Sequence, residues 1–96
     1  MYQLGVLSIQ LKFPNCRSLK DKRSRLKPLI IRLHREFNIS VAEIDLQDNW
    51  ANTIIACTMA GNDASHLQRS LESVRKWVEA NWPDGQVIDN KIEIIK

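Results

Sequence analysis

Eight basic side chains between residues 17 and 35 form the part of the chain best suited to bind phosphate groups. They are Arg17, Lys20, Lys22, Arg23, Arg25, Lys27, Arg32 and Arg35. The same stretch holds one acid, Asp21, whereas the rest of the chain carries six bases and ten acids. The formal net charge of +3 therefore hides a strong separation of charge along the chain. A basic surface of this density attracts polyanions such as nucleic acids.

Helical geometry divides these bases between phosphate contact and long-range attraction. At 100° per residue, Lys20, Arg23 and Lys27 lie along one flank of the apolar stripe, and Arg25 and Arg32 lie along the other. The free N–H groups and the dipole of a helix start also favour an anion. The residues expected to contact phosphates are Arg17, Lys20, Lys22, Arg23 and Lys27, with Arg25, Arg32 and Arg35 adding attraction. The alternative is a solvated helix face, because lysine and arginine are good helix formers.

Features that would read individual bases are few. The expected third strand, residues 53–59, lacks the stacking aromatics of an RRM, and the three glycines form no GxxG loop of the KH type. Trp50 follows an Asp-Asn turn and could stack on a base or contact a partner, but a tryptophan there more often caps the open end of a core. Recognition is therefore expected to depend on phosphates and shape.

Residues for catalysis or metal binding are scattered. His34 and His66 are far from each other and from any cluster with ligand spacing, so no metal site and no cofactor are expected. Glu43 and Asp45, two apart on a strand, are expected on its solvent face. One remote enzymatic alternative is acylphosphatase-like, with Arg17 holding phosphate and Asn49 or Asn52 positioning water, although the glycine-rich loop of those enzymes is absent. We expect a protein that is not an enzyme.

The hydrophobic pattern predicts six elements in the order β-α-β-β-α-β. Strands are expected at residues 4–13, 39–47, 53–59 and 87–95. One helix is expected between an N-cap at Ser18 and a stop at Asn38, and a second between Asp63 or Ser65 and Trp82. Pro28 should kink the first helix or divide it. The order predicts a ferredoxin-like α+β sandwich, with both helices on one face of a four-stranded antiparallel sheet.

Length and composition favour one small cytoplasmic domain spanning residues 1–96. A chain of 96 residues leaves no room for a second core. No apolar run approaches the roughly 20 residues of a membrane helix, and the N-terminus lacks the basic region of a signal peptide. Two separate cysteines do not suggest a disulfide framework.

A second hypothesis concerns association with other proteins. A ferredoxin-like sheet leaves one face uncovered, and Leu4, Val6 and Ile54 are expected to make that face apolar. Ile31 also lies off the core stripe of its helix. The protein could therefore act as an interaction module or form a homodimer.

Three segments carry a resemblance to a known family: residues 17–23 (Arg-Ser-Leu-Lys-Asp-Lys-Arg), residues 37–43 (Phe-Asn-Ile-Ser-Val-Ala-Glu), and Gln47-Asp48 with Trp50. Over essentially its whole length the chain resembles the YlxP-like proteins, a family of small bacterial proteins of unknown function. It departs from them at Leu46, where histidine is frequent, and at Asn49, where an apolar residue is usual. The resemblance implies a ferredoxin-like fold, a bacterial source and an association with translation, and it carries over no catalytic residue.

These observations predict a non-enzymatic accessory factor that binds structured RNA or a ribosomal particle through its basic first helix. The resemblance and the charge pattern both select the start of that helix.

Overall fold

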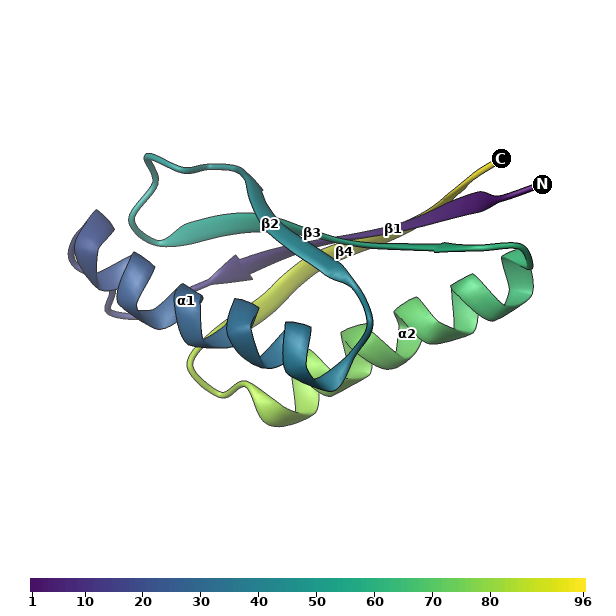
Figure 1. The fold of residues 1–96 in the computed structure, drawn as a ribbon. Coiled ribbons are helices and arrows are strands. Elements are labelled where there is room, and N and C mark those ends of the chain that lie inside the picture. The colour runs from purple at the N-terminus through teal and green to yellow at the C-terminus, as the bar shows by residue number, and fades with distance from the viewer.

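The computed structural model describes residues 1–96, and the chain forms four strands and two helices in the expected order (Figure 1). The elements are β1 (Gln3–Lys12), α1 (Leu19–Glu36), β2 (Ser40–Asp45), β3 (Asn52–Gly61), α2 (Ala64–Asn81) and β4 (Gln86–Ile95).

The strands form one antiparallel sheet in the order β2-β3-β1-β4. Both helices lie on the same face of this sheet, and the other face is uncovered (Figure 1). The ferredoxin-like arrangement predicted from the sequence is confirmed. The edge strands are β2 and β4. The hairpin loop between β2 and β3 lies at one end of the sheet, beside the start of α1 (Figure 1).

The core lies between the helices and the central strands. Alternate residues of β1 point toward the helices, beginning with Leu7, and α1 contributes Leu26, Leu29 and Leu33 to the same layer. Each fully buried leucine contributes about 1.5–3 kcal/mol relative to an exposed one. At Gly5 the helix α2 approaches β1 closely, and a methyl group there would lie 2.8 Å from Cδ1 of Leu71, so the leucine side chain would have to shift.

The start of α1 is fixed by local hydrogen bonds. Ser18 is the N-cap, and its hydroxyl accepts from the N–H of Asp21 at 3.0 Å. The Asp21 carboxylate accepts in turn from the N–H of Arg17 at 3.4 Å. This reciprocal arrangement resembles a capping box and satisfies donors that the helix itself cannot. Pro28 is exposed and does not divide the helix, which runs without a break from Leu19 to Glu36.

Neither helix combines the length and the apolar character needed to cross a membrane.

Candidate nucleic-acid interface

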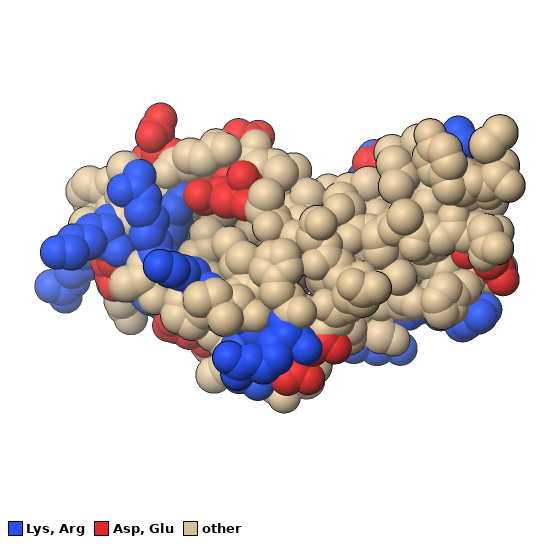
Figure 2. Space-filling model, viewed as in Figure 1, with Lys and Arg blue, Asp and Glu red and all other residues tan.

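Most of the bases on and just before α1 are available to a ligand. Lys and Arg gather at the end of the molecule where α1 begins (Figure 2). Six of the eight residues selected from the sequence form this accessible group: Arg17, Lys20, Arg23, Lys27 and Arg35 are exposed, and Arg32 is half-buried. None of these six has a carboxylate within ion-pair distance, because the five ion pairs of the molecule involve other bases. The ammonium and guanidinium groups can therefore take phosphate oxygens without breaking an existing pair.

Lys22 is not part of this surface, and its predicted role as a phosphate ligand is wrong. Its side chain is only 1% exposed. The Nζ atom donates to the carbonyl oxygens of Leu46 at 2.8 Å, Asn52 at 3.2 Å and Gln47 at 3.4 Å. It also lies 2.9 Å from Oε2 of Glu43. A buried ammonium needs such partners, since an unpaired charge in the interior is very costly. Lys22 thus holds the β2–β3 hairpin against α1.

Glu43 belongs to the same buried network, so the expectation that it lies on the solvent face is wrong. Its Oε2 also accepts from the hydroxyl of the buried Thr53 at 2.6 Å. A register shift between Glu43 and Asp45 separates the two acids, so the simple alternation of a regular strand does not apply to both. Glu43 faces the helices and Asp45 is exposed.

The sequence did contain a signal for the burial of Lys22. The residue lies four positions before Leu26 and seven before Leu29, and both leucines belong to the core. Residues with these spacings share one face of a helix. The helical positions therefore indicate an inward-facing Lys22, whereas Lys20 and Arg23 fall outside the stripe.

Trp50 lies on the β2–β3 loop with its side chain 56% exposed, so the expectation that it caps the core is wrong. The loop around it is well ordered by hydrogen bonds. The amide oxygen of Asn49 accepts from the N–H groups of Ala51 and Asn52, both at 2.9 Å. The carbonyl of Ala51 accepts from the N–H of Phe13 at 2.7 Å. The indole is therefore exposed on an ordered loop whose backbone contacts Phe13, the residue that follows β1.

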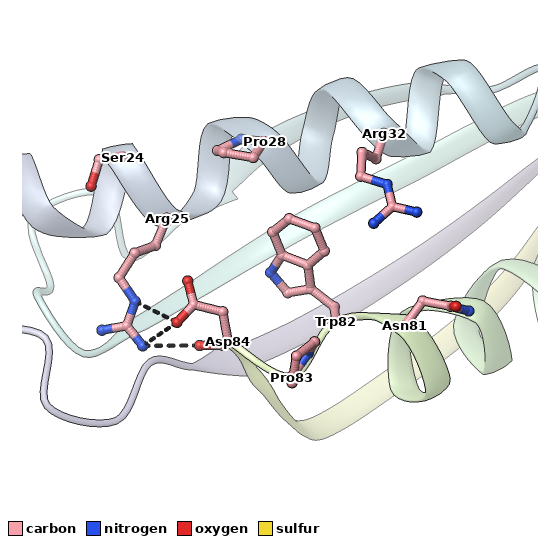
Figure 3. A pocket seen from close by; sticks show the side chains of 8 residues that line it. All are labelled: Ser24, Arg25, Pro28, Arg32, Asn81, Trp82, Pro83 and Asp84. Atoms are coloured by element: carbon pink, nitrogen blue, oxygen red, sulfur yellow. Dashed lines mark hydrogen bonds and ion pairs between the residues drawn. The ribbon is translucent and has the colours of Figure 1, made fainter.

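Arg25 has a structural role that limits its availability (Figure 3). Its guanidinium donates to Oδ1 and the carbonyl of Asp84, at 3.0 and 2.9 Å, and to the carbonyl of Pro14 at 3.0 Å. It also lies 5.2 Å from the centre of the Phe13 ring. The hydrogen bond to Asp84 raises the pKa of Arg25. Arg25 thus ties α1 to the loops that follow β1 and α2.

Arg25 and Arg32 both line a cleft of about 340 Å³, together with Trp82 (Figure 3). The guanidinium of Arg32 lies 5.0 Å from the centre of the Trp77 ring, and Trp77 meets Phe37 edge to face. A cation over an aromatic ring keeps its charge, so Arg32 can add to the positive potential of α1. The indole N–H of Trp82 is buried without a hydrogen-bond partner.

A shallow groove of about 430 Å³ lies between α1 and β2. Its apolar residues are Leu26, Ile30 and Ile31, and its charged residues are Arg23, Lys27 and Glu43. Two of the exposed bases therefore stand beside an apolar surface, where a ligand could place a ring or a sugar as well as a phosphate.

The side chain of Asn49, one candidate for an acylphosphatase-like role, is already used to hold the turn through its amide oxygen. Asn52 contributes its backbone instead: its carbonyl accepts from Lys22, and its N–H donates to Asn49. These contacts give both residues a local structural function.

Comparison with known proteins supports the resemblance found in the sequence. Residues 4–92 match the family described as "Protein of unknown function (DUF503)". Over 63 residues the chain is 30% identical to a Bacillus subtilis (strain 168) protein described as "Uncharacterized protein YlxP". The matched stretch covers 66% of this chain and 68% of that protein. The segment at residues 17–23 lies within the matched family region, and in the structure its Ser18, Asp21 and Lys22 form hydrogen bonds at the start of α1 and to the β2–β3 loop.

Proposed function

Given that the chain belongs to the DUF503 family of proteins of unknown function, we propose that it is a non-enzymatic accessory factor that binds structured RNA, as free RNA or in a ribosomal particle. The phosphates would contact Arg17, Lys20, Arg23 and Lys27. Arg32 and Arg35 would add long-range attraction.

The observation that carries this proposal is the absence of acidic partners around exposed cations concentrated on one helix. A protein surface usually mixes charges of both signs, whereas here Asp21 is the only acid among eight bases. Binding of phosphates to such a surface releases the counterions condensed on the nucleic acid, and this release supplies most of the affinity. The resemblance to YlxP-like proteins implies an association with translation and so favours RNA over other polyanions.

Phosphate contacts position a protein on RNA but do not by themselves select a sequence. The proposal therefore concerns RNA of a given shape and charge, and ribosomal RNA offers such a surface in large amounts.

The test is retention of the purified protein on ribosomal subunits and on bulk structured RNA across a salt titration. Four phosphate contacts predict a slope of log affinity against log salt of about −3 to −4. Failure to bind either material at low salt would contradict the proposal.

A second candidate function is protein association through the uncovered sheet face. Leu4 and Ile95, which are paired on neighbouring strands, are exposed, and Val6 and Ile54 are half-buried. Their apolar area favours contact with another protein or a second copy. Light scattering on a dilute sample distinguishes this function, because a dimer held by apolar area should persist as salt is raised.

A further inference from the structure

We propose that Trp50 is a stacking platform for an unpaired base, so that the preferred ligand is RNA with a single-stranded or bulged segment beside its structured part. This inference rests on the proposed function, since the phosphates of the same RNA are held by α1. The juxtaposition that suggests it is an exposed indole on a loop that Lys22 attaches to the basic helix.

The exposure of Trp50 is unusual for its residue type. Tryptophan is buried in most proteins because of its large apolar area, and Trp77 and Trp82 here pack against the core. Trp50 instead keeps 56% of its surface open on a loop that hydrogen bonds hold in place. An aromatic ring presented in this way can stack on any base, because every base has a π face.

The placement of the loop is fixed relative to the phosphate-binding residues. Lys22 Nζ takes carbonyl oxygens on both sides of Trp50, from Leu46 and Gln47 before it and from Asn52 after it. Arg23 directly follows Lys22 in the chain, and its side chain is exposed. The loop that carries the indole is therefore attached to the helix that carries the exposed cations, which lowers the entropy lost when both bind the same strand.

The distribution of charge assigns the two parts of a nucleotide to different sides of this surface. Asp45 and Asp48 are exposed on the hairpin with Trp50, whereas the exposed lysine and arginine side chains lie on α1. Acidic and basic groups lie close together at this end of the molecule (Figure 2). The carboxylates repel phosphates from the hairpin, so the sugar–phosphate chain should lie along α1. The nucleobase can then reach the indole of Trp50. A base paired within a duplex has no free face to stack, and this selects unpaired RNA.

The experiment compares Trp50→Ala and Trp50→Phe with the unaltered protein, using a 10-nucleotide single-stranded RNA and a short RNA duplex as probes at one low salt concentration. Loss of base stacking should weaken single-strand binding by roughly tenfold in Trp50→Ala, while Trp50→Phe keeps most of the affinity. Duplex binding should change less than twofold in both variants. The matched control is Tyr2→Ala, which removes an aromatic side chain, 69% exposed, at the opposite end of the sheet (Figure 1).

The outcomes separate this inference from the function on which it rests. If Trp50→Ala binds both probes as the unaltered protein does, or loses both equally, stacking by Trp50 is overturned while phosphate binding by α1 stands. If the unaltered protein binds neither probe at low salt, both proposals are overturned. Thermal unfolding should be nearly the same for all variants, since the replaced side chains are exposed.

Discussion

The Nζ atom of Lys22 lies 2.9 Å from Oε2 of Glu43, and this contact joins the first turn of α1 to the edge strand β2. The pair is enclosed by three backbone carbonyls and the hydroxyl of Thr53, so neither charge depends on water for its partners. It attaches the hairpin that carries Trp50 to α1. The most basic part of the sequence thus contains one partner of the least exposed ion pair of the molecule as well as the candidate RNA contacts.

Lys22→Met should destabilise the protein strongly. The substitution keeps much of the side-chain volume but leaves the half-buried Glu43 carboxylate and the carbonyl of Leu46 without the ammonium group that they contact, at a cost of about 1–3 kcal/mol. Denaturant unfolding followed by tryptophan fluorescence measures this loss. The matched control is Lys20→Met, two residues earlier on the exposed side of the helix, which should change the free energy of unfolding by about 0.5 kcal/mol or less. Equal stabilities for the two variants would contradict the structural role of Lys22.

Arg25→Lys should lower stability even though it preserves the charge. Lysine cannot make the forked contacts with Asp84 and Pro14, so we expect a loss of about 1–2 kcal/mol. Its RNA affinity should remain close to that of the unaltered protein, because Arg25 already contacts Asp84. Arg75→Lys is the control, since Arg75 makes one partly exposed pair with Glu79. The structural role assigned to Arg25 fails if the two variants unfold at the same denaturant concentration.

Cys57 should be protected from thiol reagents as long as the protein is folded. Burial raises the pKa of its thiol to about 12, and the thiolate is the reactive form. In Cys16→Ser, which leaves Cys57 as the single thiol, iodoacetamide at pH 8 should label the chain only after denaturation. Rapid labelling under native conditions would contradict the burial.

The same shift gives the direction of a pH effect on stability. Because the pKa of Cys57 is higher in the folded chain than its ordinary value of 9.0, its contribution to stability is complete below pH 9 and is lost as the pH rises toward 12. Cys57→Ala should show a smaller decline over that range in denaturant unfolding.

The fold could be predicted from the sequence because hydrophobic periodicity reports directly on which faces are buried. Alternation in β1 and the helical spacing of Leu26, Leu29 and Leu33 each selected a single face, and the order of elements then left one common topology. The end of β2 was less predictable. Its register shift breaks the alternation between Glu43 and Asp45, and such a shift depends on pairing with β3, which no local pattern records.

The candidate site was predicted only in part, because residue type alone does not distinguish a buried base from an exposed one. Lys22 was grouped with its neighbours by charge, although its position relative to Leu26 indicated burial. Arg25 points to partners that are distant in sequence: Asp84, on the loop after α2, is 59 residues away. The hairpin that carries Trp50 is attached to α1 by the contact of Lys22 with the carbonyl of Leu46, which lies 24 residues away. Tertiary contacts of this kind determine which side chains are available at the candidate site, and the local spacing of residues in the sequence does not predict them.

The most direct test of the central claim is the salt dependence of RNA binding in two triple variants with equal loss of charge. One replaces Lys20, Arg23 and Lys27 with glutamine, and the other replaces Arg69, Lys76 and Lys96, which are also exposed but lie on α2 and at the end of β4. If α1 holds the phosphates, the slope of log affinity against log salt should become shallower by about 2 to 3 in the first variant and stay nearly unchanged in the second. Equal slopes in the two variants would show that only net charge matters and would contradict the assignment of the site to α1.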